Sequence, residues 1–276
     1  MPIRPLAALA LALSLALSPA AAPAQMPGDS RLQLLETGDA GRGWLAVGRL
    51  NVGENTFCTA TLIAPDRVLT AAHCLFEASS GRRVNTGDIE FLAGWRIGRA
   101  EAIRGVRRVA IAPGFRMRSG QALSQVANDL AVLELDRPIR LTGLQPLPLA
   151  SGSPAAGSAV AVVSYARDRA EAPSLQDRCT VMDRRRDGVL VMSCSIDFGA
   201  SGAPVFSLDG GVPRVVSVIS AMAETANGHS MALGMRLDGR VAALMDMLDS
   251  PAVQRLGPVA APDSAGARGS ARFVRP

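Results

Sequence analysis

The stretch Arg67–Cys74 reads RVLTAAHC, and it contains one of the two histidines of this 276-residue chain. Its first residues are typical of a short strand, which ends in small residues before His73. A second stretch, Gly199–Pro204, reads GASGAP and presents Ser201 in a turn of small residues. A serine hydroxyl becomes a good nucleophile only when a base removes its proton. We therefore expect His73 and Ser201 to act together. The other histidine, His229, lies in a polar turn, where a structural or surface role is expected.

The sequence between Trp44 and Met235 consists of short apolar or alternating runs separated by glycine, proline and polar turns. Such runs, with turns at near-regular intervals, predict an all-β sandwich or a pair of barrels. A proline-, glycine- and serine-rich segment at 142–158 is the expected boundary between two β halves. The one convincing helix after the N-terminal segment is 237–250, in which apolar residues recur at helical spacing and a serine and proline end the pattern.

The N-terminal segment 1–24 has one arginine, an apolar run and small residues near its end. This is the pattern of a secretory signal peptide, with cleavage expected after Ala24. The run is shorter than the ~20 residues that span a bilayer, and no later segment is long and apolar enough to do so. The mature chain is expected to be exported to the periplasm or the extracellular space. Residues 251–276 are rich in proline, alanine, glycine and serine, and we expect a disordered tail there.

The formal net charge is +5 and all basic residues are arginines, but aromatic residues make up only 4%. The arginines are scattered and too few aromatics accompany them to stack on bases, so a nucleic-acid partner is not expected. Arg184–Arg186 is the one dense basic run. We interpret it as the solvated tip of a hairpin, and an anion-contact site for cell-wall polymer or lipid phosphate remains the alternative.

Four cysteines lie in the expected exported part: Cys58, Cys74, Cys179 and Cys194. An even number in an oxidising compartment favours two disulfides, and the wide spacings do not suit a zinc site. We therefore expect no metal, although counting alone does not choose the pairing.

The segments LTAAHC, NDLAVLEL and GASGAP together resemble the trypsin and chymotrypsin family of serine proteases, and most closely the bacterial branch that includes the glutamyl endopeptidases. The resemblance implies a catalytic triad of His73, Asp129 and Ser201, which follow one another at separations of 56 and 72 residues. The order His, Asp, Ser is that of chymotrypsin-like enzymes. The resemblance extends from about Trp44 to Leu248.

The resemblance implies two packed six-stranded antiparallel β-barrels with a C-terminal helix and the active site between the barrels. The expected boundaries are 25–145 for the barrel with His73 and Asp129, 146–236 for the barrel with Ser201, and 237–250 for the helix. It also implies disulfides Cys58–Cys74 and Cys179–Cys194, the second clipping a hairpin that turns near Asp187 and Gly188. The backbone N–H groups of Gly199 and Ser201 are the expected oxyanion donors.

The chain departs from the animal digestive enzymes at Ala200, where they carry an aspartate that pairs with a new N-terminal amine after zymogen cleavage. A matching activation segment is also missing, so no zymogen salt bridge is expected. The resemblance puts Ser195 at the base of the specificity pocket and Ser220 and Met222 along its wall, with Asp197 as an alternative pocket residue. Ile219 stands where glutamyl endopeptidases carry a histidine that reads glutamate. These residues predict preference for a small or medium uncharged side chain.

The function predicted from these observations is an exported serine endopeptidase that forms an acyl-enzyme, acts on a protein or peptide, needs no cofactor and is a monomer. The alternative is a catalytically inactive, protease-like binding protein of the cell envelope, because a fold alone does not give activity.

Overall fold

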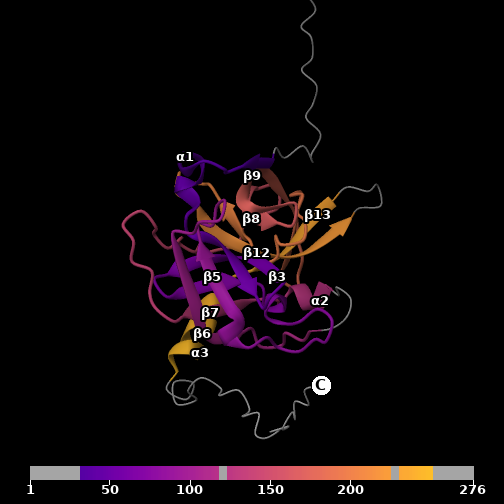
Figure 1. Ribbon diagram of the computed structural model, residues 1–276. Helices are drawn as coiled ribbons and strands as arrows, with labels where there is room; N and C mark the ends of the chain where they lie inside the picture. The colour runs from indigo at the N-terminus through magenta and orange to yellow at the C-terminus, as the bar shows by residue number, and fades with distance from the viewer. Residues whose placement is uncertain (1–31, 118–122, 225–229, 251–276) are drawn as a thin grey trace, which may run out of the picture.

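The computed structural model describes residues 32–117, 123–224 and 230–250 of the chain (Figure 1). Its strands are β1 (Leu32–Leu34), β2 (Val47–Val52), β3 (Thr56–Ala64), β4 (Arg67–Thr70), β5 (Ile89–Ala93), β6 (Ala102–Ile111), β7 (Ala131–Leu135), β8 (Ala159–Ala166), β9 (Arg169–Arg184), β10 (Val189–Met192), β11 (Pro204–Ser207), β12 (Arg214–Glu224) and β13 (Ser230–Arg236). The helical segments are α1 (Gly38–Gly41), η1 (Arg42–Trp44), η2 (Ala72–Leu75), η3 (Thr86–Asp88), α2 (Leu123–Val126) and α3 (Arg240–Asp249).

The first barrel is closed by six antiparallel strands in the order β2-β3-β4-β7-β6-β5. Most buried residues of its strands are apolar, and every residue of β7 is buried. Gly48 lies where β2 pairs with β5, and a Cβ built there would come within 2.5 Å of the Leu92 carbonyl oxygen. This close approach of two backbones permits only glycine at that position.

The second barrel consists of β8, β9, β10, β13, β12 and β11, and it closes because β9 pairs with both β8 and β10. The expectation of two six-stranded antiparallel barrels is therefore confirmed. The β9–β10 hairpin turns at Arg185–Gly188, as predicted, and Gly188 takes the left-handed backbone conformation there with φ +92°. Long β9 also accepts β1 as an added strand, Leu32 pairing with Gln176. Residues that precede the first barrel in sequence thus belong to the sheet of the second.

The interior is apolar and the two barrels share part of it. One cluster of buried residues runs from the first barrel through Tyr165 and Phe206 of the second to α3. At the junction, the Trp44 and Phe206 rings lie 4.9 Å apart, and the Tyr165 hydroxyl donates a hydrogen bond of 2.8 Å to the Trp95 carbonyl oxygen. A second cluster fills the other barrel. Burial of these rings across the junction stabilises one relative placement of the barrels.

Helix α3 packs against β6 and β7 at the end of the first barrel (Figure 1). Val241, Leu244 and Leu248 are buried, as their helical spacing predicted. A charged network reinforces the contact, because the buried Arg67 of β4 pairs with Asp249 of the helix at 2.6 Å and with Glu134 of β7 at 3.8 Å.

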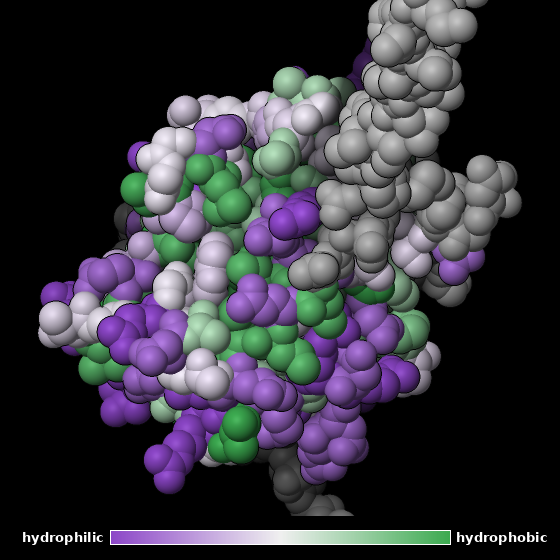
Figure 2. All heavy atoms as spheres, turned by 90° about the horizontal axis from the view of Figure 1, so that it is seen from above, coloured by the Kyte–Doolittle hydropathy of each residue, from purple (hydrophilic) through white to green (hydrophobic). Residues whose placement is uncertain are grey.

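Seen from above Figure 1, hydrophobic residues lie near the middle of the face with hydrophilic residues among and around them (Figure 2). Across the ranges given above, no helix is long and apolar enough to cross a membrane. The expected signal peptide at 1–24, the expected tail at 251–276 and His229 all lie outside the described residues.

Candidate active site

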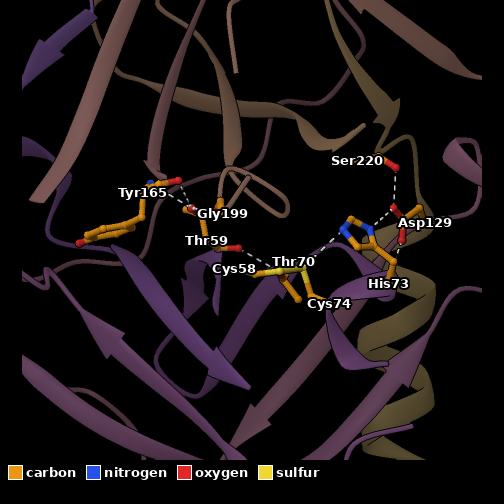
Figure 3. Close-up of a disulfide and its surroundings, with 9 residues drawn as sticks. All are labelled: Cys58, Thr59, Thr70, His73, Cys74, Asp129, Tyr165, Gly199 and Ser220. Carbon is orange, nitrogen blue, oxygen red and sulfur yellow. Dashed lines mark hydrogen bonds and ion pairs between the residues drawn. A yellow bond between two sulfur atoms is a disulfide. The ribbon is translucent and has the colours of Figure 1, made fainter. Parts of the chain in front are cut away.

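His73 lies in the short helical turn η2, directly after the end of β4. The disulfide between Cys58 and Cys74 joins β3 to this turn at the residue that follows the histidine (Figure 3). The second disulfide joins Cys179 to Cys194, so both expected pairings are present. The first bridge closes a loop of about 15 residues, which contributes on the order of 3 kcal/mol in the entropic account. It also holds the backbone of the histidine turn against β3.

Asp129 holds His73 through both oxygens of its carboxylate (Figure 3). One oxygen lies 2.6 Å from His73 Nδ1, and the other accepts a hydrogen bond of 2.7 Å from the His73 backbone N–H. Ser220 of β12 donates a third hydrogen bond to the carboxylate. Asp129 itself is only 3% exposed. With Nδ1 occupied, Nε2 remains as the ring atom that can exchange a proton with a substrate or nucleophile.

The environment of His73 raises the pKa of the imidazole above its ordinary value. Burial alone lowers this pKa, because it disfavours the charged ring. The charge of Asp129 and its hydrogen bond to the ring act in the opposite direction and together outweigh burial. The site therefore favours the imidazolium that forms when the histidine accepts a proton.

Ser201 lies in the loop between β10 and β11, in the same cleft as His73. The cleft has a volume of about 460 Å³. In the described part of the chain, no hydrogen bond joins Ser201 Oγ to the His73 ring. Hydrogen bonds of this kind are often long before substrate binds and tighten in the complex. The structure thus brings the serine and the histidine to one cleft, while Asp129 and Ser220 hold the histidine from behind.

We refer to residues Asp197–Gly202 as the oxyanion loop. The Phe198 carbonyl oxygen accepts a hydrogen bond of 2.8 Å from the Arg167 N–H. Because C=O and N–H point in opposite directions across a trans peptide, the Gly199 N–H points away from Arg167. Neither the Gly199 N–H nor the Ser201 N–H has a hydrogen-bond partner among the residues that the structure describes. Both residues line the cleft, which keeps these two amides as the candidate donors to a developing negative charge.

Gly199 is required by the shape of this loop. Its φ of +98° lies in the region that favours glycine, and a Cβ built there would lie 2.5 Å from Phe57 Cε2. Ala200, the next residue, is fully buried in the apolar cluster of the second barrel. An aspartate side chain there would enter an apolar environment. Because Ala200 has no carboxylate, an ion pair at this position cannot hold the oxyanion loop, and the hydrogen bonds of its backbone hold it instead.

The predicted specificity residues lie in different places. Ser220 and Met222 line the cleft, whereas Ser195 is exposed and does not line it. Ile196 and Ile219 line it instead. Asp197 also lines the cleft, but one of its carboxylate oxygens accepts a 2.6 Å hydrogen bond from the Phe198 N–H within the loop.

The sequence did not single out two other residues of the cleft, Arg167 and Phe198. The Arg167 guanidinium lies over the Phe198 ring, 4.8 Å from its centroid. Phe198 could have been noticed as the large residue directly before Gly199, whereas a turn residue such as Arg167 carries no such signal. Arg184–Arg186, by contrast, is exposed at the hairpin tip as expected, and Arg185 pairs with Asp187 at 3.3 Å.

A family model described as a trypsin-like peptidase domain matches residues 58–213, more than half of the chain and a range that contains His73, Asp129 and Ser201. Among solved structures, a Glu endopeptidase in complex with MPD is similar with a TM-score of 0.63 and 18% sequence identity. The similarity covers 80% of this chain and 96% of that chain. At this identity the likeness concerns the fold. With two antiparallel barrels and a match over the region of the cleft, the chain belongs to the trypsin-like peptidases and is a serine protease.

Proposed function

We propose that the chain is an exported serine endopeptidase that cleaves peptide bonds through a Ser201–His73–Asp129 triad and an acyl-enzyme. The observation that carries the proposal is the clamp of Asp129 on His73, at 2.6 Å and 2.7 Å, in a cleft shared with Ser201. Such a carboxylate keeps the ring in the tautomer with Nδ1 protonated and Nε2 free to act as a base.

In the first step, Ser201 Oγ attacks the carbonyl carbon of the peptide bond and His73 Nε2 takes its proton. The carbonyl oxygen becomes negatively charged and accepts hydrogen bonds from the N–H groups of Gly199 and Ser201. The C–N bond then breaks, and His73 returns the proton to the leaving amine. The acyl group stays on Ser201 Oγ until water, deprotonated by His73, attacks it and releases the carboxylic acid and the free serine.

The substrate residue on the acyl side is proposed to have a small or medium uncharged side chain. Ile196, Ile219 and Ala221 supply apolar surface to the cleft, and the Asp197 carboxylate is engaged by its own loop. This apolar part of the wall gives a charged side chain no partner, and burial of an unpaired charge is costly. The Arg167 guanidinium, which also lines the cleft, lies over the Phe198 ring. Cleavage of a peptide library concentrated after arginine or glutamate would contradict this preference.

Export is proposed from the pattern of residues 1–24 and is supported by the two disulfides, which persist in oxidising compartments. The periplasm and the extracellular space both meet this requirement. The chain is further proposed to act as a monomer on protein or peptide substrates.

A fluorophosphonate probe tests the enzyme proposal, because it forms a covalent bond with an activated serine. We expect labelling of Ser201 in the oxidised wild-type protein and none in Ser201→Ala or His73→Ala. Ser207→Ala is a matched control, since Ser207 lies on β11 outside the cleft and its hydroxyl bonds Asp209. A folded, oxidised wild-type sample that does not react would instead support the inactive binding protein.

A further inference from the structure

Thr59 is a fully buried residue of β3, in the first barrel, whose hydroxyl reaches into the second barrel (Figure 3). Its Oγ1 donates a hydrogen bond of 2.8 Å to the Gly199 carbonyl oxygen and accepts one of 3.0 Å from the Tyr165 N–H. A hydroxyl has a single proton to donate, and the Gly199 carbonyl oxygen at 2.8 Å is a closer acceptor for it than the Tyr165 carbonyl oxygen at 3.5 Å. The Thr59 side chain thus connects the first barrel to β8 and to the oxyanion loop.

The Thr59 backbone contacts the same loop. Its N–H donates to the Ser201 carbonyl oxygen at 2.8 Å, and its own carbonyl accepts from Thr70 Oγ1 at 2.9 Å. One residue therefore binds the carbonyl groups on both sides of Ala200. The two amides expected to stabilise the oxyanion belong to these same residues, Gly199 and Ser201.

Each peptide group of the loop is held by one or more hydrogen bonds, and most of these come from backbone atoms. Arg167 N–H holds the Phe198 carbonyl at 2.8 Å, and Ala203 N–H holds the Ala200 carbonyl at 3.0 Å. The peptide between Gly199 and Ala200 is held by Thr59 Oγ1 and by the Ala200 N–H, which bonds the Asp197 carbonyl at 3.0 Å. Within the described part of the chain, Thr59 is the one residue outside the loop whose side chain hydrogen-bonds a loop peptide.

Rotation of the Gly199–Ala200 peptide would disturb the amide on each side of it. Glycine gives little resistance to such a rotation, because it occupies many backbone conformations at low cost. Without the hydroxyl, the Gly199 carbonyl would lose its donor and the buried Tyr165 N–H would lose its acceptor. A buried polar group without a hydrogen-bond partner raises the free energy of the fold, so rotation of this peptide toward a new partner would become favourable.

We propose that Thr59 is a positioning residue that holds the two oxyanion amides in their active orientation, in a loop where the buried Ala200 offers no carboxylate for such a role. This inference rests on the proposed function. It makes the active form of the loop depend on the docking of the first barrel against the second, so that completion of the fold takes the place of an activating cleavage.

The test compares Thr59→Val, which removes the hydroxyl at nearly constant shape, with Thr59→Ser, which keeps it. Thr61→Val is the matched control, because Thr61 is a fully buried threonine of the same strand and its hydroxyl has no hydrogen-bond partner among the described residues. All variants are purified oxidised, and folding is checked by circular dichroism and thermal unfolding.

We expect kcat for a peptide substrate to fall about 10- to 100-fold in Thr59→Val with KM within about twofold, somewhat less than the 10²- to 10³-fold loss for a missing oxyanion donor. Thr59→Ser and Thr61→Val should remain within about threefold of wild type. The affinity of a peptide boronate, whose tetrahedral adduct occupies the same site, should fall in parallel with kcat. The acid limb of the pH–rate profile should not move, because Thr59 does not contact His73.

Folded Thr59→Val with wild-type kcat and boronate affinity would overturn the inference, as would an equal loss in Thr61→Val. If Thr59→Val does not fold, Thr59→Ala and Thr59→Ser decide the matter, since equal kcat in the two contradicts a role for the hydroxyl. A wild-type protein that fails to react with the fluorophosphonate would refute the proposed function itself. An active wild type with an unaffected Thr59→Val refutes only the role of Thr59.

Discussion

Ser220 and His73 hydrogen-bond the same carboxylate oxygen of Asp129, although Ser220 comes from the second barrel and His73 from the first. The carboxylate therefore receives donors from both sides of the junction. Because its charge controls the basicity of the histidine, the position of one barrel against the other affects the chemistry of the site.

Removal of the Ser220 hydroxyl should leave the Asp129 carboxylate with one donor fewer and increase its attraction for the imidazolium. In Ser220→Ala we expect the acid limb of kcat/KM to shift to higher pH and activity at neutral pH to fall by about 3- to 10-fold. Ser217→Ala is the control, because the buried Ser217 hydroxyl on the same strand donates to the Met235 carbonyl oxygen. This variant should leave the acid limb of kcat/KM unchanged. An unmoved limb in Ser220→Ala would contradict this account.

The pH dependence of the wild-type enzyme should reflect the raised pKa of His73. In the proposed mechanism His73 must be neutral to accept a proton, so kcat/KM should rise with pH through a midpoint above the ordinary histidine value. The same shift links to stability: the charged pair with Asp129 stabilises the fold below the ordinary pKa, and this contribution is lost as pH rises through the folded-state pKa.

Replacement of Asp129 by asparagine should abolish most activity, by about 10⁴-fold, because the ring would lose the tautomer that catalysis needs. The pKa of His73 should then fall, which NMR titration of the ring can follow. Asp136→Asn, at an exposed aspartate just beyond β7, should change neither quantity. A His73 pKa that stays raised in Asp129→Asn would show that another group causes the shift.

A side chain at Gly199 should disable the oxyanion loop, since a Cβ would come within 2.5 Å of Phe57 Cε2 at a φ of +98°. We expect kcat of Gly199→Ala to fall by about 10²- to 10³-fold with little effect on KM. Gly210→Ala is the control, because it has a φ of +80° and no atom within 4 Å of the added carbon. Equal kcat in the two variants would mean that the loop tolerates the methyl group.

Glu134 should make the stability of the protein fall at low pH. It is 2% exposed and pairs with Arg67, Arg107 and Arg108. Burial raises its pKa, but the hydrogen bonds and charges of these arginines prevail and hold the pKa below its usual range. Its contribution to stability is therefore present above the unfolded-state pKa of glutamate and is lost as pH falls through the folded-state value.

Glu134→Gln should lower the free energy of unfolding by about 1–3 kcal/mol at neutral pH, because the mostly buried Arg108 would lose its charged acceptor, while Arg67 keeps Asp66 and Asp249. Urea unfolding at neutral pH and at pH near 3 should show that the variant and the wild type differ less in their free energies of unfolding at the lower pH. Glu90→Gln, at an exposed site on β5, should stay within about 0.5 kcal/mol of wild type. A difference that does not vary with pH would contradict the assigned role of the carboxylate.

Local patterns predicted the helix and an all-β sandwich or pair of barrels, and the resemblance to the trypsin and chymotrypsin family implied the two six-stranded barrels. The runs that became β4, β7 and β12 are rich in apolar residues, and Val241, Leu244 and Leu248 repeat at helical spacing. Burial drives both patterns, so they can be recognised in sequence. The pairing of β1 with β9 could not be predicted, because a three-residue exposed strand has no apolar pattern and its partner lies far along the chain.

The residues that line the specificity part of the cleft could not be predicted from sequence spacing either. Ser195 was chosen by its distance in sequence from the nucleophile, but the backbone between them turns so that Ile196 and Asp197 line the cleft and Ser195 faces solvent. The direction of a side chain in a loop depends on the dihedral angles of that loop. Residue spacing does not specify these angles.

From the sequence alone came the chemistry: a histidine after a strand, a carboxylate before another, a serine in a glycine turn and cysteines that pair as expected. These features are short motifs, and each residue type has a reactivity of its own. Only the tertiary structure revealed which residues hold the oxyanion loop when Ala200 has no carboxylate to do so. Thr59 reaches the Gly199 carbonyl from 140 positions away, at 2.8 Å. Such a contact depends on how two barrels dock, and docking is determined by the whole apolar junction rather than by any one segment.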